Sequence, residues 1–230
     1  MKENFQSIVT KGLFITFEGI SGSGKSENVE SLRSYLASKG YRVSVVEWNS
    51  NVLIRKIIYK INSINLLNSE LYSFFQWLSF ILDYFFKIRP GLKKNDILIA
   101  DRYIYTGLTR DSANGASGRL GRAIYKRIIK PHLVFYQDVN PRECYKRILR
   151  RGKTLFHTNK VIKESSIIKN KDLFYLMKLR KEYILLFNNH GIKQDADIMW
   201  IRDNPEIVIK RAEEYISGKR GSQEYVKTFN

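Results

Sequence analysis

The sequence predicts an α/β fold in which a five-stranded parallel sheet carries helices on both faces. Short apolar, β-branched runs alternate with helical patterns along the chain, which is the order that parallel strands and crossover helices produce. The 230 residues are enough for one domain with a sizeable core, and we expect residues 1–230 to form it. Hydrophobic residues make up 43% of the chain, so it is not a disordered chain despite its charge.

Strand and helix patterns appear in turn through the first half of the chain. Residues 12–18 read GLFITFE, a β-branched and aromatic run that predicts a buried strand. Residues 26–39 place Val29, Leu32 and Leu36 on one helical face. The same two patterns predict the next elements: a strand at residues 41–48, helices at 52–64 and 71–88, and a strand at 96–103.

The alternation continues through the second half. Pro90 and Gly91 are expected to break the helical pattern before the third strand, and Pro131 ends the next helix. Residues 153–171 are polar, lysine-rich and weakly periodic, so we expect a mobile segment there, and a frayed tail at residues 218–230. The remaining predictions are helices at 119–129, 141–151, 172–188 and 205–216, and strands at 132–139 and 197–202.

The charge balance favours anionic partners. With 40 Lys and Arg against 22 Asp and Glu, the formal charge is +18, which suits nucleotides, phosphorylated substrates or nucleic acid. The single cysteine, Cys144, excludes an internal disulfide. Residues 1–9 have no secretory pattern, and the apolar residues 71–86 are too short to span a bilayer. We therefore expect a cytoplasmic protein without a membrane partner.

A phosphate-binding loop is the strongest motif. Residues 19–26 read GISGSGKS, which fits G-x-x-x-x-G-K-[ST] between a predicted strand and a predicted helix. Glycines let backbone N–H groups wrap a phosphate closely, and the helix N-terminus adds partial positive charge. We expect Lys25 to bridge the terminal phosphates of ATP and Ser26 to ligate Mg²⁺. The rest of the nucleotide-binding loop is Ser21, Gly22, Ser23 and Gly24.

Several segments together resemble one family. Residues 14–26 (FITFEGISGSGKS), the Asp101-Arg102-Tyr103 motif, residues 132–139 and residues 175–187 occur in the order and spacing typical of thymidylate kinases, within the P-loop nucleoside and nucleotide kinases. The resemblance covers nearly the whole chain. It implies a P-loop kinase fold with a basic lid, which we place at about residues 152–171.

The resemblance implies roles for basic residues around the phosphates. Arg102 would reach both the acceptor and the transferring phosphate, where a guanidinium suits bidentate contact. Asp101 would hold Mg²⁺ through water or accept hydrogen bonds from substrate. Arg147 and Arg151 would close over the phosphates from the lid, with Lys153 as a further candidate for a catalytic cation.

The acceptor half departs from the family pattern. Ser21 stands where the family usually has an aspartate that contacts the sugar. Residues 46–51 (VEWNSN) replace an Arg-Glu-Pro-Gly-Gly pattern whose arginine grips the acceptor phosphate. Residues 105–111 (YTGLTRD) replace a Ser-Ser-x-Ala-Tyr-Gln pattern that holds thymine. We therefore predict an atypical acceptor site.

Glu47 and Trp48 offer a second interpretation of that site. A carboxylate followed by tryptophan at the end of the second strand resembles deoxynucleoside kinases, in which the glutamate is the general base for a sugar hydroxyl. A hydroxyl acceptor needs such a base more than a phosphate does. We place the acceptor among these residues: Glu47, Trp48, Asp101, Arg102, Tyr105 and Arg110.

Three functions remain open at this point. The first is an ATP- and Mg²⁺-dependent phosphotransferase acting on a nucleoside monophosphate, most simply a thymidylate-like one. The second is a kinase of a hydroxyl acceptor: a deoxynucleoside, a small metabolite or a modified nucleic-acid base. The third is a nucleic-acid-binding P-loop ATPase, which the charge supports. The aromatic helix at residues 71–88 is either core or, as the resemblance implies, the contact helix of a homodimer.

Overall fold

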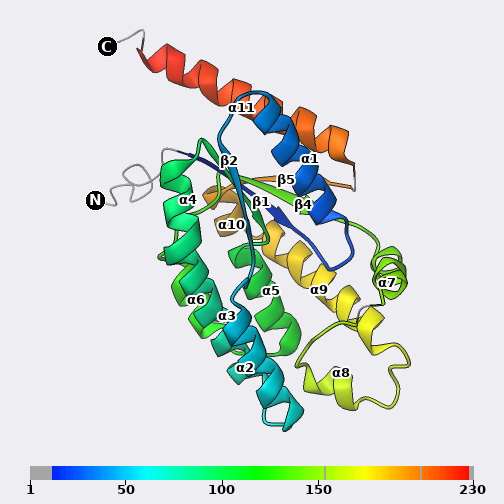
Figure 1. The fold of residues 1–230 in the computed structure, drawn as a ribbon. Coiled ribbons are helices and arrows are strands. Elements are labelled where there is room, and N and C mark those ends of the chain that lie inside the picture. Colours follow the sequence, from blue (N-terminus) through cyan, green and yellow to red (C-terminus); the bar gives the residue numbers. More distant parts are fainter. Residues whose placement is uncertain (1–11, 153, 203, 228–230) are drawn as a thin grey trace.

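One parallel sheet runs through the molecule (Figure 1). The computed structural model describes residues 12–152, 154–202 and 204–227. Neighbouring strands are parallel throughout, in the spatial order β2-β3-β1-β4-β5. This confirms the predicted five-stranded sheet. The strands are β1 (Leu13–Glu18), β2 (Val43–Glu47), β3 (Ile97–Asp101), β4 (Leu133–Gln137) and β5 (Asp197–Ile201).

Helices lie on both faces of the sheet, as predicted. α1 (Lys25–Ser38) and α11 (Pro205–Lys227) pack side by side on one face of the sheet. The helices α3, α5 and α9 lie on the other face (Figure 1). The further helices are α2 (Val52–Ser63), α3 (Ser69–Asp83), η1 (Tyr84–Ile88), α4 (Arg89–Lys94), α5 (Ile104–Asn114), α6 (Arg119–Tyr125), α7 (Pro141–Arg150), α8 (Lys160–Glu164), α9 (Lys171–Asn188) and α10 (His190–Asp195).

The central strand β1 connects two apolar layers. Ile15 and Phe17 belong to the cluster formed with α1 and α11, whereas Phe14 belongs to the opposite cluster and packs edge-on against Tyr103 at 4.9 Å between ring centroids. Successive side chains of a strand point to opposite faces, so a strand covered on both sides must be apolar almost throughout. Thr16 is polar and Glu18 is the charged residue of the strand, at the carboxyl end where the site begins. Among the described helices, none combines the length and apolarity needed to cross a membrane.

Pro90 and Gly91 do not break the helix, contrary to the prediction. The chain stays helical from α3 through the π-helical turn η1 into α4, and the N–H of Arg89 donates to the carbonyl of Tyr84. Pro90 falls in the first turn of α4, where a missing N–H costs little. The wider π turn supplies the offset that lets the proline follow without a break.

Like α4, the helices α5, α8 and α10 were not predicted. α5 contains β-branched residues and Gly107, a weak intrinsic helix former, and it is held by packing against α3 and α9 rather than by propensity. α8 and α10 each begin at an asparagine whose side chain accepts a backbone N–H. α11 continues to Lys227, so the predicted frayed tail is helical over its described part, and residues 228–230 lie outside the described residues.

Candidate active site

The phosphate loop connects β1 to α1, as predicted. Its backbone passes so close to neighbouring segments that side chains are excluded: a Cβ on Gly22 would lie 2.6 Å from the carbonyl oxygen of Cys144. Gly22 and Gly24 also have φ of 83° and 94°, in the left-handed region that glycine adopts freely. The glycines of the motif therefore have a geometric cause, and they leave the loop as a concave main-chain turn at the start of a helix.

Lys25 lies buried at the centre of this loop. Its Nζ donates to the carbonyl of Ile20 at 2.7 Å and to Ser23 Oγ at 3.0 Å. Burial and the nearby Arg102 hold the pKa of Lys25 well below its usual range, while Asp101 and Glu18 act in the opposite direction. A buried cation whose hydrogen bonds go to neutral loop atoms is suited to an incoming anion.

Ser26 and Asp101 meet across the mouth of the loop. Ser26 Oγ donates to Asp101 Oδ2 at 2.8 Å, which joins the first turn of α1 to the end of β3. A hydroxyl and a carboxylate are hard oxygen ligands of the kind Mg²⁺ prefers. Within the described residues there is no cluster of three or more metal-ligating side chains. The pair therefore fits a cation that takes its other ligands from phosphate oxygens and water, as Mg²⁺ does.

Arg102 follows Asp101 in an unusual conformation. Its φ is 75°, in the left-handed region that costs a residue with a Cβ about 1–2 kcal/mol. Its backbone N–H donates to the carbonyl of Phe17 at 3.0 Å, and its Nη1 donates to the carbonyl of Gly19 at 2.6 Å. The turn thus places the guanidinium against the phosphate loop, in contact with Gly19.

Glu18 supports this turn from inside the protein. Its fully buried carboxylate accepts the N–H of Tyr103 at 2.7 Å, Thr106 Oγ1 at 2.7 Å and the hydroxyl of Tyr183 at 2.9 Å. Burial raises the pKa of Glu18, although these hydrogen bonds and Arg102 favour the charged form. The sequence analysis assigned no role to Glu18, and only its place as a lone acid ending a buried strand marked it.

One cavity of about 280 Å³ opens over the phosphate loop. Arg151 lines it, as expected, and Arg147 Nη1 lies 3.5 Å from the carbonyl oxygen of Gly22. Lys153, the further candidate, lies outside the described residues. Ser23 is buried and turned to Lys25. The other expected phosphate-site residues line the cavity: Ser21, Gly22, Gly24, Lys25, Ser26, Asp101 and Arg102.

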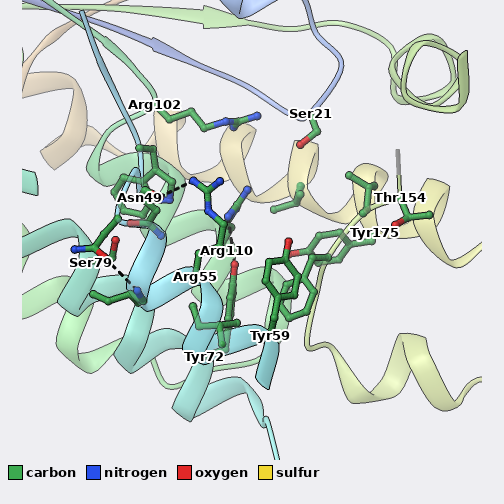
Figure 2. A pocket seen from close by; sticks show the side chains of 17 residues that line it. Ser21, Asn49, Arg55, Tyr59, Tyr72, Ser79, Arg102, Arg110, Thr154 and Tyr175 are labelled. Atoms are coloured by element: carbon green, nitrogen blue, oxygen red, sulfur yellow. Dashed lines mark hydrogen bonds between the residues drawn. The ribbon is translucent and has the colours of Figure 1, made fainter. Parts of the chain in front are cut away.

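A second cavity, of about 360 Å³, shares part of its lining with the first, and Figure 2 shows the side chains that line it. Arg55, Arg102 and Arg110 point into it, and Tyr59, Tyr72 and Tyr175 group beside them. No Asp or Glu lies in its described lining. Four residues line both cavities: Ser21, Arg102, Thr154 and Leu155.

Trp48 forms part of the wall of the second cavity. Its ring packs edge-on against Trp77 at 6.0 Å and tilted against Phe80 at 5.1 Å between centroids. Its backbone N–H donates to the carbonyl of Asp101 at 3.1 Å. The tryptophan is therefore packed against the core and also forms part of the cavity wall, where the acceptor was expected.

Two expected acceptor residues lie elsewhere. Glu47 is exposed at the end of β2 and lines neither cavity. Tyr105 is fully buried, packs on Phe187 at 5.2 Å between centroids, and lines neither cavity, so its expected place in the acceptor site is wrong. Tyr105 and Arg110 are five residues apart on α5, which turns them by roughly 140° around the helix. Only Arg110 therefore faces the cavity.

The sequence analysis missed the residues that α2, α9 and residues 154–156 bring to the second cavity. Arg55 and Tyr59 are one turn apart on α2, and Phe156 packs against Tyr59 at 5.8 Å and Tyr72 at 5.4 Å between centroids. The i, i+4 spacing of Arg55 and Tyr59 is a signal that they share a helix face. Nothing in the sequence indicates that this face meets α5.

A parallel sheet in this strand order, with a phosphate loop after β1 and an Asp-Arg pair after β3, defines a P-loop kinase. The family model of thymidylate kinase matches residues 17–195. The chain belongs to the thymidylate kinase family, whose members are phosphotransferases.

Individual relatives agree with this assignment. The chain is 36% identical over 138 residues to the "Probable thymidylate kinase 2" of Saccharolobus solfataricus, a match that covers 60% of this chain and 64% of that protein. It is 26% identical over 211 residues to the "Probable thymidylate kinase" of Archaeoglobus fulgidus, covering 91% and 100%. It is 25% identical over 224 residues to the "Thymidylate kinase" of Caldanaerobacter subterraneus subsp. tengcongensis, covering 91% and 99%.

Proposed function

We propose that this protein is an ATP- and Mg²⁺-dependent nucleoside monophosphate kinase, with a thymidylate-like nucleotide as the acceptor. One observation carries the proposal: the phosphate-loop cavity and the arginine-lined cavity meet at Arg102, which lines both. A phosphoryl group moves in line between two bound oxygens, so a donor site and an acceptor site must share a boundary that holds positive charge. Arg102 supplies that charge.

The donor side has the parts that ATP needs. The main-chain turn at Gly22 and Gly24 receives the phosphates, with Lys25 at its centre and Arg151 in the lining of the same cavity. Ser26 and Asp101 would hold Mg²⁺, which neutralises charge on the phosphate oxygens when bound. The chemistry left to the protein is positioning and electrostatic stabilisation.

The acceptor side fits a phosphate. A phosphomonoester is already deprotonated at neutral pH and requires no general base, whereas a hydroxyl does. The described lining of the second cavity contains three arginines and no carboxylate, and Glu47 lies outside it. This favours a monophosphate over the hydroxyl acceptors considered above. The aromatic residues Trp48, Tyr72 and Phe156 provide apolar surface for a base.

Residues 152–171 are proposed as the lid. Thr154 and Leu155 line both cavities, so movement of this segment would open or seal the two sites together. The middle of the segment is anchored, since Asn159 Nδ2 donates to the carbonyl of Ala113 at 2.7 Å. Closure over bound nucleotides would exclude water, which otherwise competes as the phosphoryl acceptor.

Two further partner predictions remain open. Phe74, Leu78 and Phe85 of α3 and η1 are exposed, which supports a homodimer through this helix. The charge of +18 keeps nucleic acid as a candidate ligand. Sedimentation equilibrium tests the first, and binding of labelled oligonucleotides across a salt series tests the second.

The direct test is turnover. Purified protein is incubated with ATP and Mg²⁺ and a panel of nucleoside monophosphates and their nucleosides, and diphosphate products are separated by ion-exchange chromatography. Lys25→Met serves as the inactive control. We expect diphosphates from at least one pyrimidine deoxynucleoside monophosphate. Phosphorylation of nucleosides alone, or ATP hydrolysis stimulated by nucleic acid with no small-molecule product, would reject the proposal in favour of the corresponding alternative.

A further inference from the structure

His157 follows directly after the lid residues that reach the two cavities. Thr154 and Leu155 line both cavities, and Phe156 lines the second. The side chain of His157 is 6% exposed, and its ring stacks on Tyr175 with 4.4 Å between centroids and 23° between planes. Tyr175 itself lines the second cavity, so the histidine packs against a residue of the proposed acceptor site (Figure 2).

The backbone after His157 is fixed to two helices. The N–H of Thr158 donates to Asn114 Oδ1 of α5 at 2.9 Å, and Ser69 Oγ of α3 donates to the carbonyl of Thr158 at 3.1 Å. Asn159 adds the contact to α5 described above. His157 therefore joins a fixed stretch of backbone to the residues that line the cavities.

Residues 154–156 are held less firmly. The N–H of Leu155 lies 3.5 Å from Asp172 Oδ2, at the limit of a hydrogen bond. The ring of Phe156 packs against one tyrosine of α2 and one of α3, at 5.8 and 5.4 Å between centroids. The position of this short segment therefore depends on the residue that joins it to the fixed backbone.

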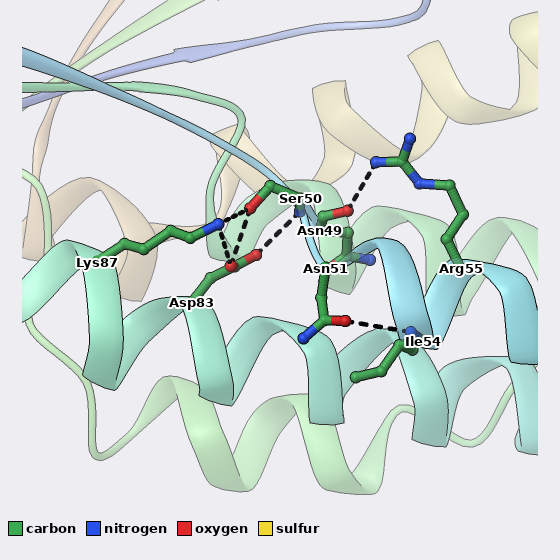
Figure 3. Close-up of polar contacts among 7 residues, drawn as sticks. All are labelled: Asn49, Ser50, Asn51, Ile54, Arg55, Asp83 and Lys87. Atoms are coloured by element: carbon green, nitrogen blue, oxygen red, sulfur yellow. Dashed lines mark hydrogen bonds and ion pairs between the residues drawn. The ribbon is translucent and has the colours of Figure 1, made fainter.

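Another wall of the same cavity is fixed without a histidine. Asn49 and Asn51 line it, and Ser50 between them donates to the buried carboxylate of Asp83 from its backbone N–H at 3.0 Å and its Oγ at 2.9 Å (Figure 3). Lys87 Nζ lies 3.1 Å from the same carboxylate. Histidine is the side chain that ordinarily titrates between pH 5 and 8, and none belongs to the described lining of this cavity. A response of the cavity to pH in that range is therefore expected from the lid.

The surroundings of the imidazole suit its neutral form. Nδ1 is buried and has no hydrogen-bond partner among the described residues. In the neutral ring this nitrogen can remain unprotonated, whereas in the imidazolium it is a donor that needs an acceptor. A buried donor without an acceptor destabilises the folded arrangement. Protonation of His157 in place is therefore unfavourable.

The charges that face the ring act mainly in the same direction. Burial and Lys163 of α8 lower the pKa of His157 below its ordinary value of 6.5, and Lys171 of α9 adds to this. Asp172 of α9 acts in the opposite direction. Two cations thus oppose one acid, and the acid does not compensate for burial.

The elements packed beside Thr158 add no free acid. Ser69 and Asn114, which contact its backbone, are uncharged. Glu70, the next residue of α3, accepts a backbone N–H from the loop before α6 at 2.6 Å. Arg110 of α5, which lies near the stacked tyrosine, is positive.

We propose that His157 is a positioning residue whose neutral ring holds residues 154–156 against the acceptor cavity, so that acidification releases them and weakens binding of the acceptor. The inference rests on the function proposed above, but release of the segment can be measured without turnover. Below pH 6.5 the ring of the released segment takes up a solvent proton more readily than the buried ring, and by linkage this favours release. Well above pH 6.5 the ring is neutral in both states, and the effect vanishes.

The test compares the wild type with His157→Phe, which keeps a flat ring for Tyr175 but cannot take up a proton. His190→Gln is the control, since His190 is exposed at the start of α10. KM and kcat for the monophosphate that the wild type uses best are measured between pH 5.5 and 7.5 at saturating ATP. The second ionisation of the acceptor phosphate, at about pH 6, affects both enzymes alike and cancels in their ratio.

We expect the KM of the wild type, relative to that of His157→Phe, to rise about threefold to 10-fold between pH 7.5 and 5.5. The upper figure is the limit set by one proton with an ordinary pKa of 6.5. At pH 7.5 the two KM values should agree within about twofold, and His190→Gln should follow the wild type at every pH.

Hydrogen–deuterium exchange of residues 154–164 gives a second measurement that needs no turnover. At pH 5.5 exchange should be faster in the wild type than in His157→Phe, and at pH 7.5 it should be equal. The same pH dependence of KM in both enzymes, or equal exchange at pH 5.5, would overturn the inference. If the wild type phosphorylates no monophosphate, the proposed function fails and the exchange comparison alone decides on His157.

If His157→Phe does not fold, the wild type is titrated by NMR through its histidine ring signals. The ring of His157 is identified by its nuclear Overhauser contact with Tyr175. A pKa below 6.5, with loss of that contact on protonation, supports the inference. A pKa of 6.5 or higher, or a ring that stays stacked when protonated, rejects it.

Discussion

The backbone N–H of Tyr103 donates a 2.7 Å hydrogen bond to the carboxylate of Glu18. This contact joins the residue before the phosphate loop to the residue after Arg102, so the two halves of the phosphate site are tied through the protein interior. Thr106 Oγ1 and the Tyr183 hydroxyl complete the set of donors and bring α5 and α9 to the same carboxylate. The buried carboxylate of Glu18 therefore stabilises the strained turn at Arg102 through its hydrogen bond to the next residue.

Glu18 should make stability depend on pH. Burial raises its pKa in the folded state above the ordinary value of 4.5. The folded protein then binds more protons than the unfolded chain at pH values between 4.5 and the raised pKa, so rising pH removes stability across that window. Glu18→Gln keeps the shape and can donate to both hydroxyl oxygens. We expect the variant to gain stability relative to the wild type as pH rises from below 4.5 to neutral, measured by urea unfolding. A difference that stays constant with pH would contradict this.

Lys25 should be essential for phosphoryl transfer but should not stabilise the folded protein in the absence of nucleotide. Burial and Arg102 lower its pKa well below the usual range, so the folded protein without nucleotide holds the cation at a cost. Lys25→Met fills a similar volume without the charge. We expect at least a 10³-fold loss of turnover, because the charge matters most in the transition state, together with an equal or higher melting temperature without nucleotide. A variant that melts lower would show that the lysine stabilises the empty loop.

Asp101 should set the Mg²⁺ requirement. Asp101→Asn keeps an oxygen that can accept from Ser26 Oγ, which donates to Asp101 at 2.8 Å, but it removes the negative charge. We expect the Mg²⁺ concentration for half-maximal rate to rise about 10–100-fold, in line with other changes around metal ligands. Asp96→Asn is the matched control, since Asp96 lies just before the other end of β3 and pairs with Arg42. An unchanged Mg²⁺ dependence in Asp101→Asn would remove Asp101 from the metal site.

The donor half of the site could be predicted because its chemistry is local in sequence. The loop at residues 19–26 offers its own backbone N–H groups to a phosphate, and Asp101 and Arg102 stand at the carboxyl end of a strand, where ligands of parallel sheets bind. Lys25 and Ser26 therefore came from the loop motif, and Asp101 and Arg102 from the family resemblance together with the rule that ligands bind at the carboxyl ends of parallel strands.

The acceptor half could not be predicted in the same way. Its cavity is assembled from α2, α5, α9 and residues 154–156, which are distant in sequence and carry no shared pattern. The helix that places Arg110 was itself missed, because Gly107 and the threonines of residues 104–114 lower helix propensity and packing decides the conformation. Without that helix, Tyr105 and Arg110 could not be assigned to different faces.

A substitution at Gly107 should affect both the packing of the core and the binding of the acceptor. A Cβ there would lie 2.5 Å from Trp77 and 2.9 Å from Trp48, whereas the nearest neighbours of one on Gly121 would be Trp77 at 2.5 Å and Leu108 at 3.1 Å. We expect Gly107→Ala and Gly121→Ala each to lower the free energy of unfolding by about 1–3 kcal/mol through overpacking. Only Gly107→Ala should also raise the KM for the acceptor, because Trp48 lines that cavity. An equal change of the acceptor KM in Gly107→Ala and Gly121→Ala would show that displacing Trp48 does not alter the acceptor cavity.

Arg102 should show separable contributions from backbone and guanidinium. Its φ of 75° strains any residue with a Cβ, and its Nη1 donates to the carbonyl of Gly19 at 2.6 Å. Arg102→Ala and Arg102→Gly both remove the guanidinium, so both should lose on the order of 10²–10³-fold in turnover. They differ in the backbone, since glycine adopts the left-handed region freely and alanine does not. We expect the glycine variant to exceed the alanine variant by about 1 kcal/mol in free energy of unfolding, the cost of a left-handed L-residue less the entropy that glycine adds to the unfolded chain. Chemical denaturation of the two variants in parallel measures the difference. Equal free energies of unfolding for the alanine and glycine variants would mean that the backbone at position 102 is not strained. The hydrogen bond from the Tyr103 N–H to Glu18 would then not compensate for any backbone strain at Arg102.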